Sequence, residues 1–201
     1  CAPISGSQGK AYFGAMAAAA NFAFANRQIM THLVRQTFER YFSSSWERLG
    51  MRLLYDCCHN IAKKETITWD GRRIQACIHR KGATRALGPG DRRLPERFRK
   101  TGQPVLVPGD MGRSSYILAG APGAKETFSS ACHGAGRLLS RQQAKKLGRG
   151  RSILDELKGR GVHAMAASRG TLAEEAPDAY KDVAEVVSTI TGAGICRAVA
   201  R

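Results

Sequence analysis

The sequence predicts an α+β fold with a mixed sheet and flanking helices. Residues 9–42 have the composition and spacing of one long helix, whereas residues 66–78 have the alternation of a β-hairpin. Helical and extended patterns do not alternate regularly along the 201 residues, so an α+β arrangement is favoured over a doubly wound sheet. This length is enough for one domain with a substantial core.

The helices are predicted from composition and stop signals. The alanine-rich stretch 9–42 carries Phe22, Ile29 and Leu33 on one side and ends at the serine run 43–45. Two further helices are predicted at residues 134–147 and 178–191, each followed by a glycine that can end a helix, Gly148 and Gly192.

The strands are predicted from short apolar or alternating runs. Asp70 and Gly71 form a hairpin turn signal between two alternating runs, and a Pro-Gly-Asp-Met-Gly turn lies between two apolar ones. The predicted strands are residues 51–55, 66–69, 74–78, 105–107 and 116–118.

The charge of the chain indicates a polyanionic partner. Thirty-two Lys and Arg residues against sixteen Asp and Glu residues give a formal net charge of +16. Half of these cations lie in residues 80–100 and 137–160, eight in each stretch. A solvated surface with a flexible loop would explain one such stretch. Two of them around the candidate chemistry favour phosphate binding and a nucleic-acid partner.

Other classes of protein fit the composition less well. A hydrophobic content of 43% argues against a disordered polyelectrolyte. The apolar run 11–25 is too short for a membrane span of about 20 residues, and it contains Asn21. The six cysteines lack a regular spacing, which favours reduced thiols in the cytoplasm. Because the chain begins with Cys1, we expect it to be a piece of a longer polypeptide.

A candidate nucleophile is His133, in a segment of small residues. These residues would let a bulky ligand approach the backbone, and a helix beginning near Gly134 would direct N–H groups at an anion. The same helix end would keep the imidazole neutral. Arg137 and Arg141, four residues apart on one helical face, would suit phosphoryl or nucleotidyl transfer. The alternative is a buried histidine that caps a helix.

A candidate metal ligand is His59. Neutral imidazole and the thiolates of Cys57 and Cys58 suit metals such as Zn or Mn, and the Asp56 carboxylate can orient the histidine. The sequence has no second cluster of Cys or His with metal-ligand spacing, so a metal bound to His59 would need ligands from outside this segment. The alternative is a pair of buried thiols followed by a turn at Asn60.

Five motifs occur in order along the chain, at residues 56–63, 79–86, 108–112, 132–137 and 174–181. Together they resemble the C-terminal half of RtcB-type RNA-splicing ligases. The alanine-rich residues 17–28 also resemble a helix of that family, so the resemblance covers nearly the whole chain. It implies that residues 1–201 are the C-terminal part of a larger single catalytic domain, without its N-terminal half and short C-terminal tail.

The resemblance implies a reaction and its partners. Such ligases join an RNA 3′-phosphate or 2′,3′-cyclic phosphate to a 5′-hydroxyl in tRNA splicing and RNA repair. They use GTP and two Mn²⁺ ions, pass through a histidine–GMP intermediate, act in the cytoplasm, and can be assisted by an archease-type activator. The other expected partner is the N-terminal half of the same ligase.

The resemblance also implies site residues. His133 matches the guanylylated histidine, His59 matches a metal ligand, and Asn60 beside it matches a nucleotide contact. Tyr180 matches an aromatic that packs on guanine. The remaining matches for the nucleotide are Pro108, Gly109, Asp110, Met111, Ser115, Gly134, Ala135 and Gly136, and those for RNA or phosphate are Arg137 and Arg141.

The chain departs from the family pattern at several positions. Asp110 stands where a small neutral residue is usual and would place a negative charge near the nucleotide. Arg113 is likewise unusual, and Cys58 replaces a serine. The other metal ligands of the family belong to its N-terminal half. These departures motivate an alternative function, a noncatalytic basic RNA-binding fragment or decayed paralogue.

Overall fold

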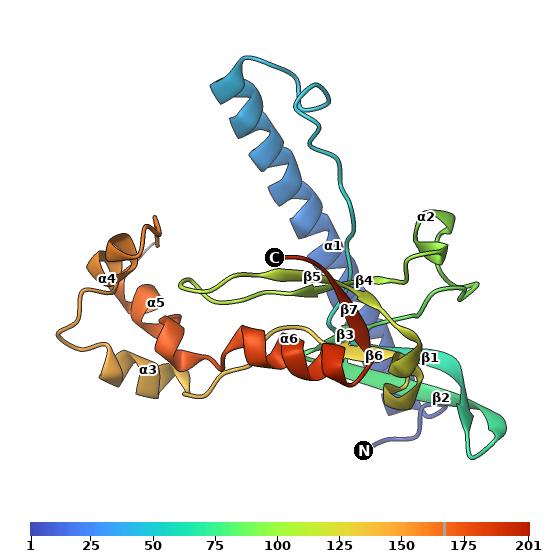
Figure 1. Ribbon diagram of the computed structural model, residues 1–201. Coiled ribbons are helices and arrows are strands. Elements are labelled where there is room, and N and C mark those ends of the chain that lie inside the picture. The colour runs from blue at the N-terminus through green and yellow to red at the C-terminus, as the bar shows by residue number, and fades with distance from the viewer. Residues whose placement is uncertain (167) are drawn as a thin grey trace.

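The computed structural model describes residues 1–166 and 168–201 and has the predicted α+β character. The long helix is confirmed as α1 (Ser7–Phe42), which ends where Ser43 adopts a left-handed conformation with φ of 49°. Figure 1 shows α1 projecting away from the rest of the molecule. Among the described residues, no helix has both the length and the apolar character needed to cross a bilayer.

The predicted hairpin is confirmed and is longer than expected. Strands β1 (Asn60–Trp69) and β2 (Arg72–Lys81) pair antiparallel along their whole length. Asp70 and Gly71 both have positive φ, 47° and 71°, which a tight hairpin turn of this kind requires. One face of the hairpin contacts α1, where the backbone N–H of Ala62 lies 3.1 Å from the sulfur of Met16.

The central sheet is formed by β4 (Pro104–Val107), β5 (Tyr116–Gly120) and β7 (Cys196–Ala200), in that order and antiparallel. The predicted strand pair at residues 105–107 and 116–118 is therefore confirmed. The helix α6 (Val183–Gly192) packs its apolar side against this sheet. The fully buried core residues include Val105 and Val107 from β4, Leu118 from β5 and Val183 from α6.

The remaining elements are short. The third sheet pairs β3 (Ala83–Arg85) with β6 (Ser130–Cys132), again antiparallel. The described strands thus form three small antiparallel sheets, where one mixed sheet was expected. The other elements are α2 (Glu96–Arg99), η1 (Pro122–Thr127), α3 (Arg141–Leu147), α4 (Ile153–Gly159), α5 (Arg169–Glu174) and η2 (Pro177–Ala179).

Three predicted elements differ from the structure. The strand predicted at 51–55 is an irregular segment that pairs with none of the described strands. The helix predicted at 134–147 begins only at Arg141, where Ser140 and Gln143 form a reciprocal capping box. The helix predicted at 178–191 begins at Val183, where the Asp182 side chain caps it.

The surface of α1 is unusually apolar. Only Gly9 is buried along this helix, and large apolar side chains are exposed over most of its length. These exposed residues are Tyr12, Phe22, Phe24, Ile29, Met30, Leu33, Val34, Phe38, Tyr41 and Phe42. The side predicted to carry Phe22, Ile29 and Leu33 exists, but in this chain it contacts solvent.

Candidate functional site

A cleft of about 440 Å³ gathers most of the predicted site residues. Three separate segments of the chain contribute to its wall: the loop between β4 and β5, the segment after β6, and the residues around η2. Its lining residues are Pro108, Gly109, Asp110, Met111, His133, Gly134, Ala135, Gly136, Glu175 and Tyr180. The predicted site residues outside this lining are His59, Asn60, Ser115, Arg137 and Arg141.

The loop between β4 and β5 is held in shape by its own side chains. The Ser115 hydroxyl accepts a hydrogen bond from the backbone N–H of Gly109 at 3.2 Å. A Cβ at Gly109 would lie 2.3 Å from the carbonyl oxygen of Ser114, so this position requires glycine. Met111 packs against the apolar cluster of Ile153 and Leu157 in α4. Ser115 therefore stabilises the loop that lines the cleft, although it does not line the cleft itself.

His133 is placed by the short sheet of β3 and β6. It directly follows β6, and its backbone N–H donates to the carbonyl of Gly82 at 3.0 Å. Its ring stacks on the ring of His59, with centroids 4.3 Å apart and planes inclined by 19°. The structure thus brings the candidate nucleophile and the candidate metal ligand into contact.

The imidazole of His133 is kept neutral by its surroundings. Burial is the main cause that lowers its pKa below the usual 6.5, and the neighbouring His59 acts in the same direction. A hydrogen bond with the Leu106 backbone opposes this shift. Its Nδ1 is buried and has no hydrogen-bond partner within the described residues. Such an unsatisfied atom in a cleft is typical of a group that awaits a ligand.

The backbone after His133 does not form the predicted helix. Gly134 and Gly136 have positive φ values of 114° and 74°, a region that favours glycine. Because α3 begins only at Arg141, a helix end at Gly134 cannot be what opposes protonation of His133; burial has this effect instead. The small residues Gly134, Ala135 and Gly136 line the cleft as an open loop, and the expected approach of a ligand to their backbone stays a prediction.

Arg137 belongs to a network within the protein. Its Nη1 donates to the Tyr180 hydroxyl at 2.8 Å and lies 3.3 Å from both carboxylate oxygens of Glu175. Its Nε donates to the carbonyl of Leu139 at 3.0 Å. The guanidinium also lies 4.8 Å from the centre of the Tyr180 ring. The shared helical face with Arg141 was therefore a wrong prediction, since Arg137 precedes the helix and bonds internally.

Glu175 is a cleft residue that the sequence analysis did not select. Its carboxylate accepts a hydrogen bond from the hydroxyl of Tyr180 as well as from Arg137, so it fixes the aromatic wall of the cleft. Local sequence gives little sign of this role because Arg137, its charged partner, is 38 positions away. Its place within the motif 174–181 was the one available signal.

His59 and Asn60 lie at the base of the hairpin. The Asn60 side-chain oxygen accepts a hydrogen bond from the backbone N–H of Gly82 at 3.1 Å, and Gly82 in turn bonds the backbone of His133. No group of three or more His, Cys, Asp or Glu side chains within residues 1–166 and 168–201 is arranged to hold a metal ion. The described residues alone therefore do not fit a complete manganese site, and His59 could supply one ligand only.

The unusual Asp110 is neutralised by the equally unusual Arg113. The Asp110 side chain is 1% exposed, and it accepts from the backbone N–H of Gly112 at 2.8 Å and pairs with the Arg113 guanidinium. Arg113 also donates to the carbonyl of Pro177 at 3.2 Å. The two departures from the family pattern thus form one ion pair that joins the cleft loop to η2.

We expect the substitutions Asp110→Ser and Arg113→Ala to be coupled. Either change alone leaves a charged partner without its ion pair, so each lowers the free energy of unfolding. The free energy of unfolding should fall less in the double variant than the sum of the two single losses. The coupling free energy should be about 1 kcal/mol, measured by denaturant unfolding of all four proteins. A matched cycle of Asp110→Ser with Lys146→Ala should be additive. Additivity of the Asp110–Arg113 pair would contradict this description.

Arg141 differs from Arg137 in its surroundings. It is the first residue of α3 and is exposed, as are Lys146 and Arg149 nearby. Other cations of the same stretch are used internally, since Lys145 pairs with Glu174 and Arg151 pairs with both Glu156 and Asp178. Only part of the basic stretch 137–160 is therefore available to an outside polyanion.

The sequence motifs that line the cleft also occur in a known protein family. A family model described as "tRNA-splicing ligase RtcB" matches residues 1–201. Proteins named tRNA-splicing ligase RtcB are similar over the whole chain. The one from Archaeoglobus fulgidus is 50% identical over 202 residues, covering 100% of this chain and 42% of the relative. Those from Thermococcus kodakarensis and Pyrococcus horikoshii are 52% and 53% identical, covering 99% of this chain and 42% and 23% of the relatives.

The motifs that surround the cleft are those of an RNA-ligase family, and the matches cover the full chain. The chain belongs to the RtcB family. It spans less than half the length of the relatives it matches.

Proposed function

We propose that this chain carries the nucleotide-binding centre of a GTP- and Mn²⁺-dependent RNA ligase. A ring nitrogen of His133 attacks the α-phosphate of GTP, forms a phosphorus–nitrogen bond and releases pyrophosphate. The GMP passes to an RNA 3′-phosphate, and an RNA 5′-hydroxyl then displaces it to close the phosphodiester bond. RNA with these ends is the proposed substrate, and the cytoplasm is the proposed location.

The main support for this proposal is the surrounding of His133. A nucleophilic nitrogen must be unprotonated, and burial keeps the His133 imidazole neutral at pH 7. His133 lines a cleft whose wall includes Gly134 and Gly136. Because these residues have no side chains, a phosphate can come close to their backbone. Tyr180, fixed by Glu175, offers an aromatic surface in the same cleft for the guanine base.

The metal part of the proposal needs ligands beyond the described residues. Bound Mn²⁺ would polarise the phosphates and offset their charge. His59 would contribute one nitrogen ligand, and its stacking on His133 supports a place beside the reacting phosphate. The carboxylate and thiolate donors that such a site requires would come from the additional length that the relatives have.

The proposal is tested with a chimera. The 202 matched residues of the Archaeoglobus fulgidus relative would be replaced by this chain, and the product incubated with Mn²⁺ and GTP labelled in its α-phosphate. We expect GMP to become attached through an acid-labile bond. A folded chimera that stays unlabelled, while the unaltered relative is labelled, would overturn the proposal and favour the noncatalytic RNA-binding alternative.

The exposed cations of α3 are the proposed phosphate contacts. Replacing Arg141 with alanine should weaken binding of single-stranded RNA and reduce the salt dependence of log K by about 0.7, the value for one phosphate contact. Fluorescence polarisation at several salt concentrations measures both quantities. The matched control is Arg40→Ala, in the last turn of α1, which should change the slope less. An equal change in both variants would argue against a specific α3 surface.

A further inference from the structure

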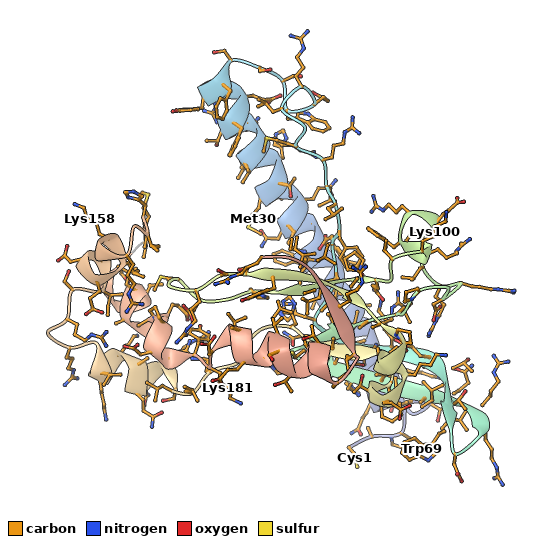
Figure 2. All side chains as sticks on the ribbon, viewed as in Figure 1. Cys1, Met30, Trp69, Lys100, Lys158 and Lys181 are labelled. Carbon is orange, nitrogen blue, oxygen red and sulfur yellow. The ribbon has the colours of Figure 1, made fainter. Side chains whose placement is uncertain are left out.

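The end of the β1–β2 hairpin carries a pair of exposed aromatic rings. Trp69, the last residue of β1, stacks on Phe128 with ring centroids 5.6 Å apart and planes inclined by 29°. Trp69 is 59% exposed and Phe128 is 37% exposed. Figure 2 shows Trp69 near the outer end of the hairpin. A stacked pair that leaves this much aromatic surface in solvent is unusual for a purely structural contact.

The backbone around Phe128 is held in a strained conformation. Phe128 and Ser129 have φ values of 53° and 52°, in the left-handed region that non-glycine residues rarely adopt. The buried side chain of Arg80 donates to the Phe128 carbonyl at 3.0 Å and to the Ser130 hydroxyl at 2.9 Å, which holds this segment against the hairpin. The position of the Phe128 ring is thus fixed, and strain of this kind often marks a functional surface.

An arginine lies beside the aromatic pair. Arg72 lies directly opposite Trp69 in the strand register, so their side chains project from the same face of the hairpin. Arg73, the next residue of β2, projects from the opposite face. Both arginines are exposed and have no ion-pair partner within the described part of the chain. Asp70, in the turn, is an exposed carboxylate.

We infer that Trp69 and Phe128, together with Arg72, form a stacking platform for a base of single-stranded RNA. Every base can stack on an exposed aromatic ring, and Arg72 beside the ring can neutralise a phosphate. A duplex keeps its bases stacked inside, so it offers the ring no free face. The net charge of +16 favours a polyanion over a protein partner at this surface. The inference extends the RNA-binding part of the proposed function.

The platform is separate from the cleft. Trp69, Phe128 and Arg72 all lie outside the cleft lining. Trp69 is at the opposite end of β1 from Asn60, whereas Phe128 precedes His133 by five residues. We expect the platform to contribute to affinity for longer strands and not to the attack of His133 on GTP.

Tryptophan fluorescence tests the platform in the 201-residue chain itself. The chain contains two tryptophans, and Trp46 lies under the Arg35 guanidinium at 3.8 Å. In a Trp46→Phe background, Trp69 is the sole reporter, and oligouridylate RNA should quench its emission to saturation. Trp69→Ala should bind this RNA about 5- to 100-fold more weakly, measured by polarisation of labelled RNA, whereas Trp69→Phe should lose much less. Circular dichroism checks that both variants fold.

Two results would overturn the platform. One is saturating RNA binding with unchanged Trp69 emission; the other is equal affinity of Trp69→Ala and its parent. Quenching by duplex RNA as strong as by the single strand would also count against stacking. The assay contains neither GTP nor metal. Failure of the chimera to form GMP–protein therefore leaves this inference standing, and failure of the platform leaves the proposed chemistry standing.

Discussion

Replacing His133 with alanine should abolish formation of GMP–protein in the chimera, a loss of at least about 1000-fold in label. The nucleophile is a ring nitrogen, and His59, the other imidazole in contact with it, lies outside the cleft lining. Circular dichroism checks that the variant folds, since alanine removes the stacking on His59 and the hydrogen bond with the Leu106 backbone. Acid-sensitive retention of labelled GMP on the denatured protein is the measurement.

The matched control is His163→Ala, since His163 is exposed and lies outside the cleft. This variant should be labelled as fully as the parent. His59→Ala should reduce the label, and an excess of Mn²⁺ should restore part of it if His59 acts as a metal ligand. Persistence of label in His133→Ala would remove the central assignment of the proposed function.

Replacing Arg80 with methionine should lower the free energy of unfolding by about 3–5 kcal/mol. Arg80 is 3% exposed, and its Nη1 lies 2.6 Å from a carboxylate oxygen of Glu65, itself 8% exposed. The same guanidinium bonds the segment that leads to His133. Loss of the Arg80 guanidinium would leave the buried Glu65 carboxylate with Arg93, 3.8 Å away, as its remaining ion-pair partner among the described residues. Denaturant unfolding followed by circular dichroism measures the effect.

A double variant tests whether the loss of stability comes from the Glu65 carboxylate that is left without its partner. Arg80→Met with Glu65→Leu removes both charges, so it should be considerably more stable than Arg80→Met alone. The exposed Arg73 of the same strand gives the control, because Arg73→Met should change stability by less than about 0.5 kcal/mol. Equal stability of the single and double variants would show that the uncompensated carboxylate is not the cause.

The elements that the sequence predicted correctly are those specified by neighbouring residues. The Asp70-Gly71 turn places its own strands in register, and the alanine-rich α1 forms through hydrogen bonds between residues four apart. The cleft residues were grouped by their motifs, and the geometry brings nine of the predicted ones together. The roles assigned to them stay predictions.

The errors arose where distant contacts override local pattern. The apolar segment 51–55 pairs with no strand in the described part of the chain, and its Tyr55 packs on Phe98 instead. Gly134 and Gly136 cannot belong to the helix predicted at 134–147, because their positive φ is incompatible with an α-helix. The signal that could have corrected this was the capping pattern of Ser140 and Gln143, which marks the true start of α3.

The position of β7 affects how the chain can fold while it is being synthesised. The sheet places β5 between β4 and β7, and the core beneath it is completed by Val183, Val187 and Ile190 of α6. These residues leave the ribosome long after β4 and β5. Until then the β4–β5 pair has an open edge and an uncovered apolar face, the condition in which nascent chains associate with one another. A chaperone that shields apolar segments would act in that interval.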